Sequence, residues 1–181
     1  MSNDIFARST TVVDAMLFAK RVHEGQERKY TGEPYIVHPF AVAGLVTSVT
    51  EDASMVMAAL LHDTVEDTPT TSQQIEMHFG TRVRKLVVDL TDVSKKVDGN
   101  RKTRVALDRA HTATASSDAK TIKLADLIDN LKAIETFDVQ FAKKYMAEKR
   151  LLLEVLTEGN SKLFGIVSSL IDNYFEKNPQ V

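Results

Sequence analysis

The sequence contains no cysteine. This absence excludes disulfides, thiolate zinc sites and cysteine nucleophiles together, and it is compatible with a reducing compartment. No run of 18 apolar residues is present, and the first residues lack the basic and apolar segments of a signal peptide. The formal net charge of −2 gives no overall attraction to nucleic acid. We therefore predict a cytoplasmic protein without a membrane or nucleic-acid partner.

Two further patterns are missing: sustained strand-type alternation and internal repeats. The chain has 181 residues and no break in composition, and 43% of its residues are hydrophobic. A chain of this length can bury about 70% of its extended-chain surface in one core. We predict an all-α fold with a single domain over residues 1–181.

The spacing of apolar residues predicts where the helices lie. Gly25 and Gly80 are expected to end helices. Periodicity fades over 92–100, and the cations that gather there and just after it are expected to form a solvated basic loop or a phosphate-facing edge; they are Lys95, Lys96, Arg101, Lys102 and Arg104. Residues 111–117 are expected to form a loose helix end or a loop. His23 is expected to be a capping or surface residue, and His78 a surface residue. Helices are predicted over roughly 11–23, 38–46, 52–63, 71–79, 83–90, 117–131, 138–157 and 161–175.

One of these helices leads into the most unusual stretch of the chain. Residues 55–61 (MVMAALL) are apolar on every side, which is typical of a helix buried in a core. They are followed at once by His62, Asp63, Glu66 and Asp67. Burying such polar groups costs on the order of several kcal/mol unless they are paired or bind a metal. Helical spacing of four would gather these four side chains over about one turn.

Two more polar residues stand beside core-type sequence. His38 begins a predicted helix, and Asp126 lies among apolar residues of another, with Asn130 one turn later. Together with His62 and Asp63 they form a mixed nitrogen and oxygen donor set, which suits Mn²⁺, Fe²⁺ or Zn²⁺. Such a metal activates water and polarises a phosphoryl group, and Glu66 and Asp67 could carry the proton.

The same pattern resembles a known family. The order of His38, the His62–Asp63 pair and Asp126 is similar to that of HD-domain metal-dependent phosphohydrolases. Residues 28–39 (RKYTGEPYIVHP), 60–68 (LLHDTVEDT) and 123–131 (KLADLIDNL) resemble the hydrolase domain of the RelA/SpoT-homologue family. The similarity runs from about residue 11 to 157, which indicates a stand-alone small alarmone hydrolase.

The resemblance implies an all-helical HD-domain fold and Mn²⁺-dependent removal of the 3′-pyrophosphate from ppGpp and pppGpp. It assigns four metal ligands, a catalytic acidic pair and four substrate-binding residues. The ligands are His38, His62, Asp63 and Asp126; the pair is Glu66 and Asp67; the substrate-binding residues are Arg28, Lys29, Asn130 and Tyr145.

The chain departs from the family pattern on the substrate side, at Leu127, Asp129 and Ala133. These departures leave the base and phosphate preference open. Three alternatives therefore stand beside the ppGpp hydrolase: an NADPH 2′-phosphatase, a hydrolase of another nucleotide such as an adenine alarmone, and a non-catalytic, antitoxin-like nucleotide-binding partner. The intact Glu66–Asp67 pair argues against the last. The expected partner is a guanosine tetra- or pentaphosphate, and a homo-oligomer is compatible with the sequence.

Overall fold

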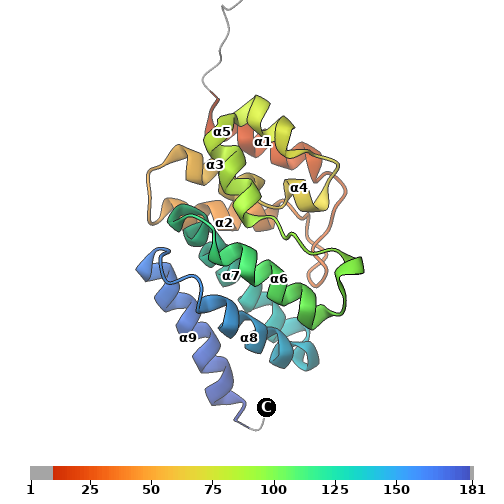
Figure 1. The fold of residues 1–181 in the computed structure, drawn as a ribbon, viewed down its shortest axis with the longest axis vertical. Helices are drawn as coiled ribbons and strands as arrows, with labels where there is room; N and C mark the ends of the chain where they lie inside the picture. The colour runs from red at the N-terminus through yellow and green to blue at the C-terminus, as the bar shows by residue number, and fades with distance from the viewer. Residues whose placement is uncertain (1–9, 180–181) are drawn as a thin grey trace, which may run out of the picture.

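The structure is a computed structural model that describes residues 10–179, without the side chains of 133 and 135–137, so the departure at Ala133 lies outside the described side chains. Within this range the chain is helical and forms no strand, although an isolated β-bridge joins Glu27 and Pro34. The predicted all-α fold is confirmed (Figure 1). The elements are α1 (Val12–Val22), α2 (Val37–Thr47), α3 (Ala53–Leu61), α4 (Thr64–Asp67), α5 (Ser72–Leu90), the 3₁₀-helix η1 (Lys96–Asp98), α6 (Arg101–Ala113), α7 (Ser117–Phe137), α8 (Val139–Leu153) and α9 (Ser161–Lys177).

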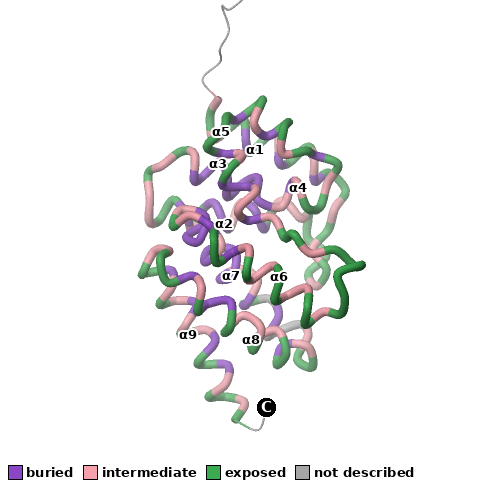
Figure 2. The backbone as a smooth tube through the Cα atoms, in the orientation of Figure 1, coloured by how far each residue is buried: buried purple, intermediate pink, exposed green. Residues whose placement is uncertain are grey.

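Helix α3 lies in the core, as its all-round apolar sequence predicts. Every side chain from Met55 to Leu61 is buried, and α3 packs against α1, α2, α5 and α7. The N-cap residue Asp52 accepts a hydrogen bond from the backbone N–H of Ser54, which satisfies a free donor of the first turn. Figure 2 shows this helix buried along its length. Because α3 ends inside the protein, the polar residues that come directly after it are also placed in the interior.

Helix α7 is the second element that positions the site. It begins after the N-cap Ser116 and packs against α2, α3, α5, α8 and α9. Leu124, Ala125, Leu127 and Ile128 are each at most 1% exposed, so the stretch around Asp126 is buried on nearly all sides. The carboxylate of Asp126 is therefore held at a fixed place in the interior.

The predicted helix break at Gly80 is confirmed. Gly80 interrupts α5 with φ of +87°, a left-handed conformation that glycine adopts without the steric cost of a side chain. The predicted capping box is also present: Thr71 and Gln74 bond each other's backbone N–H groups at the start of α5.

The expected helix end at 111–117 is present, because α6 ends at Ala113 and a short turn follows, but the helix itself was not predicted. Residues 101–113 form α6, with His111 on the helix and its Nε2 3.1 Å from the carbonyl oxygen of Val88. Of the α6 residues only Thr112 is buried. The helix is mostly polar and its only large apolar residues are Val105 and Leu107, so its sequence gives a weaker signal than that of the core helices. His23 is the C-cap of α1, in line with a capping role, but it is buried and not on the surface.

The α8–α9 connection approaches α7 closely at Gly159. A Cβ at this position would lie 2.7 Å from Leu124 Cδ1 and 3.1 Å from the carbonyl carbon of Lys120. We expect Gly159→Ala to lower the free energy of unfolding by about 1–3 kcal/mol, as overpacking does. Gly165→Ala on α9, where a Cβ meets no atom within 4 Å, should be neutral or stabilising by about 0.5–1 kcal/mol. Urea unfolding of both variants measures the difference, and equal stabilities would contradict the tight packing.

Candidate active site

The interior end of α3 delivers two of the predicted ligands. The helix ends at Leu61, His62 and Asp63 form a turn, and α4 follows with Glu66 and Asp67. The four side chains therefore do not lie on one continuous helix, because the turn residues His62 and Asp63 separate α3 from α4. His62 is 2% exposed, and the Asp63 side chain is 19% exposed.

Four predicted ligands, from three distant stretches, meet at one point. His38 Nε2 lies 3.3 Å from Asp126 Oδ1 and 3.5 Å from Asp63 Oδ2. His62 Nε2 lies 3.0 Å from Asp63 Oδ2 and 3.9 Å from Asp126 Oδ1. One ligand atom each from His38, His62 and Asp126 lie within 4.8 Å of one another, and all three residues are buried. The structure therefore brings together the full predicted donor set.

Both imidazoles are oriented by the nitrogen that faces away from this cluster. His38 Nδ1 lies 2.7 Å from Asp129 Oδ2, and His62 Nδ1 lies 2.9 Å from the carbonyl oxygen of Ala59. Each Nδ1–H donates to its oxygen partner, which leaves the Nε2 lone pair directed at the cluster. Metal-binding histidines are held in this way, because the outer partner fixes both tautomer and ring orientation.

The carboxylate of Asp126 is bonded on both oxygens. Asn130 donates to its Oδ1 at 2.6 Å, and Lys123 Nζ lies 3.0 Å from its Oδ2. Burial opposes the charged form, but the Lys123 ammonium and the two histidines outweigh burial and hold the pKa of Asp126 well below its usual range. The lysine was not foreseen as a site residue, although it stands three residues before Asp126 in the motif.

A tyrosine holds the other carboxylate. The hydroxyl of Tyr35 donates to Asp63 Oδ2 at 2.5 Å. Burial and the adjacent Asp63 charge raise the pKa of this hydroxyl, so it stays protonated and serves as a donor. Burial disfavours ionised Asp63 too, yet His62 and His38 keep its pKa well below the usual value.

This arrangement fits a divalent cation. Within the described residues, His62 Nε2 is buried and has no hydrogen-bond partner, although it points at the carboxylates. Burial lowers the pKa of His38, but the carboxylates of Asp126, Asp129 and Asp63 outweigh burial and raise it to about 11, so Nε2 holds a proton unless a cation takes its place. The cluster therefore strongly favours positive charge at its centre. Two imidazole nitrogens and two carboxylate oxygens are suitable ligands for a divalent transition metal.

The predicted acidic pair lies beside the cluster, but its two members contact different segments. Glu66 Oε2 accepts a hydrogen bond from the backbone N–H of Asp92 at 3.2 Å, and Asp67 accepts one from Gln26 at 3.3 Å. The pKa of Glu66 is raised to about 7. Burial of its carboxylate away from water is the larger cause, and the nearby charge of Asp92 is the second. A group with a pKa near neutral can both accept and release a proton.

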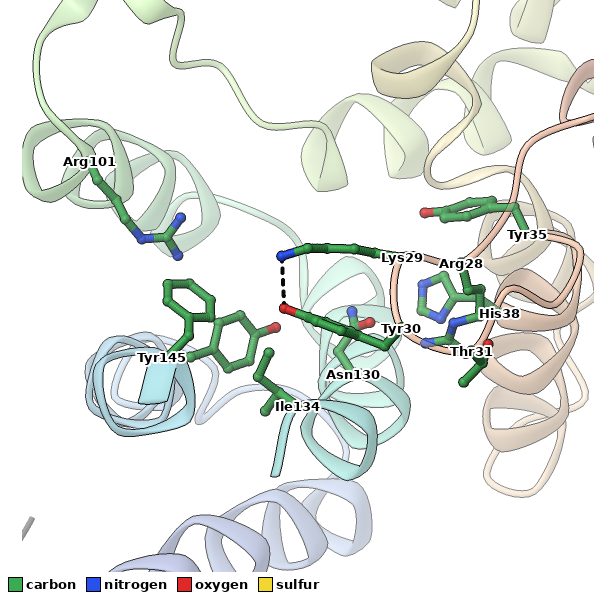
Figure 3. A pocket seen from close by; sticks show the side chains of 11 residues that line it. Arg28, Lys29, Tyr30, Thr31, Tyr35, His38, Arg101, Asn130, Ile134 and Tyr145 are labelled. Atoms are coloured by element: carbon green, nitrogen blue, oxygen red, sulfur yellow. Dashed lines mark hydrogen bonds between the residues drawn. The ribbon is translucent and has the colours of Figure 1, made fainter. Parts of the chain in front are cut away.

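A cleft of about 400 Å³ adjoins the cluster through His38 and Asn130. In Figure 3, Tyr145 and Arg101 lie on one side of this cleft and Arg28 on the other, with Asn130 between them. The four predicted substrate-binding residues all line it. The full lining is Arg28, Lys29, Tyr30, Thr31, Tyr35, His38, Arg101, Asn130, Ile134, Phe141 and Tyr145.

Cations and aromatic rings dominate the cleft wall. Lys29 is 75% exposed at the rim, and its Nζ lies 3.1 Å from the Tyr30 hydroxyl. Arg101 pairs with Glu148 through two nitrogens at 2.7 and 3.0 Å and covers the Phe141 ring at 4.9 Å. Such a wall suits a ligand that combines a flat ring with phosphate groups. Arg101 stands in the basic stretch for which a phosphate-facing edge was one of two expectations.

Comparisons with known proteins agree with this geometry. A family model described as an HD domain matches residues 15–152. The chain is 41% identical over 129 residues to the human guanosine-3′,5′-bis(diphosphate) 3′-pyrophosphohydrolase MESH1, covering 70% of each chain. It is 40% identical over 139 residues to the Aquifex aeolicus guanosine-3′,5′-bis(diphosphate) 3′-pyrophosphohydrolase, covering 72% of this chain and 19% of that protein.

The solved structure of a metazoan orthologue of SpoT, described as hydrolysing ppGpp, superposes with a TM-score of 0.82. It is 28% identical, and the match covers 97% of this chain and 99% of the other. The chain belongs to the HD-domain family. Within that family its relatives are the SpoT-like hydrolases, so the predicted resemblance is confirmed. Among residues 10–179, no helix has the length and hydropathy to cross a bilayer.

Proposed function

We propose that this protein is a metal-dependent hydrolase of ppGpp and pppGpp, releasing the 3′-pyrophosphate to leave GDP or GTP. The observation that carries the proposal is the continuity between a cationic, aromatic cleft and the buried cluster of His38, His62 and Asp126. The SpoT-like relatives, which carry this activity in their names, support the choice of substrate.

The metal in this proposal is Mn²⁺, held by His38, His62, Asp63 and Asp126. When bound, it supplies Lewis-acid chemistry, which activates water and neutralises charge on the phosphoryl oxygens. Mn²⁺ suits the mixed imidazole and carboxylate donor set, and no thiolate is present to favour softer metals.

The chain's own residues account for substrate placement and proton transfer. Asn130, which lies between the cluster and the cleft, holds the ribose so that its 3′ substituent faces the cluster. Water attacks the phosphorus that carries the 3′ oxygen, the bond between them breaks, and pyrophosphate leaves. Glu66 accepts a proton from the attacking water and then gives it to the ribose 3′ oxygen, which becomes the 3′ hydroxyl of GDP or GTP. Asp67 is the second candidate for this proton transfer.

A panel of nucleotides incubated with Mn²⁺ tests the substrate. Anion-exchange chromatography would follow ppGpp, pppGpp, the corresponding adenosine nucleotides and NADPH over the same time course. The proposal predicts that the guanosine nucleotides are consumed fastest. Preferential consumption of NADPH or of adenosine nucleotides would show that the substrate is assigned wrongly. Binding of ppGpp without turnover would point to a non-catalytic nucleotide-binding partner.

Arg28 tests the cleft. Its guanidinium lines the wall, where it can stack on the purine equally in the ground and transition states. We expect Arg28→Ala, assayed at saturating Mn²⁺, to raise KM about tenfold or more while kcat changes much less. Lys102→Ala, at an exposed position of α6 outside the cleft lining, is the matched control. A fall in kcat with unchanged KM would contradict the assignment.

A further inference from the structure

Asp129 connects the cleft with the cluster. Its Oδ2 lies 2.6 Å from Arg28 Nη1 and 2.7 Å from His38 Nδ1, so one oxygen accepts from both. The side chains of Arg28 and Asp129 are 15% and 19% exposed, and that of His38 is 3% exposed. Asp129 lies three residues after Asp126 on α7, so the two carboxylates share a face of the helix.

The hydrogen bond to Asp129 decides which nitrogen of His38 faces the cluster. A carboxylate that accepts from Nδ1–H stabilises the tautomer in which Nε2 is the lone-pair donor. His38 Nε2 is the atom that approaches Asp126 and Asp63. Arg28 in turn holds the carboxylate through a charge-assisted hydrogen bond, which is among the stronger polar contacts in proteins.

We propose that Asp129 is a positioning residue of the metal centre: it fixes the tautomer and orientation of His38, and Arg28 anchors it from the cleft. This inference rests on the metal centre of the proposed function. The sequence predicted that the departure at Asp129 concerns the substrate side alone, and the contact of Asp129 with His38 Nδ1 corrects that prediction. The chain thus uses one carboxylate to join a substrate-cleft residue to a metal ligand.

Metal affinity without nucleotide tests the proposal directly. Metal-stripped protein is titrated with Mn²⁺, and free Mn²⁺ is measured by electron paramagnetic resonance. We expect Asp129→Leu to weaken binding about 10–100-fold, as loss of an outer partner of a ligand does. Asp129→Asn should lose less, since its amide oxygen still accepts a hydrogen bond. Asp118→Leu, which removes a carboxylate paired with Arg82 at the start of α7, should bind as wild type does.

A double variant separates positioning from charge. Asp129→Leu removes a negative charge near the metal and leaves Arg28 unbalanced, and either effect alone would weaken cation binding. Arg28→Gln combined with Asp129→Leu restores the charge balance but not the acceptor for His38. We expect this double variant to remain about tenfold or more below wild type. Full recovery would show that charge, not orientation, is responsible, and would overturn the proposal.

The tautomer of His38 can also be read without any variant. In ¹⁵N nuclear magnetic resonance of the wild-type protein loaded with diamagnetic Zn²⁺, the proposal predicts a proton on Nδ1 of His38, and a proton on Nε2 would overturn it. Wild-type affinity in folded Asp129→Leu would overturn the inference but leave the metal centre intact. Failure of the wild-type protein to bind Mn²⁺ or Zn²⁺ would remove the metal centre itself, and the inference with it.

Discussion

Replacement of His62 by alanine should abolish metal binding and turnover together. His62 contributes a buried Nε2 that has no hydrogen-bond partner among the described residues and lies 3.0 Å from Asp63 Oδ2. Without it a cation would have three protein ligands, and His38 would supply the only remaining imidazole nitrogen beside the two carboxylates. We expect affinity for Mn²⁺ to fall by more than the roughly 10–100-fold that loss of an outer partner causes.

The fold should survive this change, because α3 is buried through Met55–Leu61 and does not depend on the imidazole for its packing. Elemental analysis of the purified variant measures the metal, and circular dichroism checks the helices. His78→Ala, at an exposed position of α5, is the matched control. Stoichiometric metal in His62→Ala would show that the ligand is assigned wrongly.

Glu66→Gln should stop the reaction while metal and nucleotide still bind. The amide keeps the size of the side chain and can still accept the hydrogen bond from the Asp92 N–H, but it cannot take a proton. Positioned acid–base groups contribute about 10²–10⁴-fold to rate, so kcat should fall by that factor with little change in KM. The carboxylate suits this role, because its raised pKa of about 7 lets it exchange protons near neutral pH.

Steady-state kinetics at saturating Mn²⁺ measures the effect, and binding of ppGpp to the inactive variant is measured separately. Glu51→Gln, at an exposed position before α3, should behave as wild type. If Glu66→Gln keeps more than about a third of the wild-type kcat, proton transfer belongs to another group. Asp67→Asn would then be the next variant, because Asp67 is the other member of the acidic pair. Its carboxylate contacts Gln26 on a different segment.

Sequence revealed the parts of this fold that depend on strong local signals. The apolar run at 55–61 predicted a buried helix, and Gly80 marked the break in α5. The sequence did not reveal α6, because that surface helix is mostly polar and contains few large apolar residues. A buried histidine such as His23 is equally hidden, since burial depends on which distant residues pack over it.

The site divides in the same way. The metal-binding pattern was visible because ionisable residues next to apolar sequence need an explanation, and the structure places those four side chains together. Asp129, Lys123 and Tyr35 were missed as contacts of the ligands, because each acts on a residue far away in the chain or within a helix turn whose orientation sequence leaves open. The rule that histidine ligands donate to a second acceptor could have drawn attention to Asp129.

The fate of the phosphate groups tests the central claim most directly. Wild-type protein, Mn²⁺ and ppGpp are incubated in ¹⁸O-enriched water, and the products are examined by ³¹P nuclear magnetic resonance and mass spectrometry. Attack of water on the phosphorus next to the ribose 3′ oxygen predicts GDP without label and intact pyrophosphate carrying one ¹⁸O. Release of orthophosphate, label in the nucleotide, or no turnover of ppGpp would contradict a 3′-pyrophosphohydrolase.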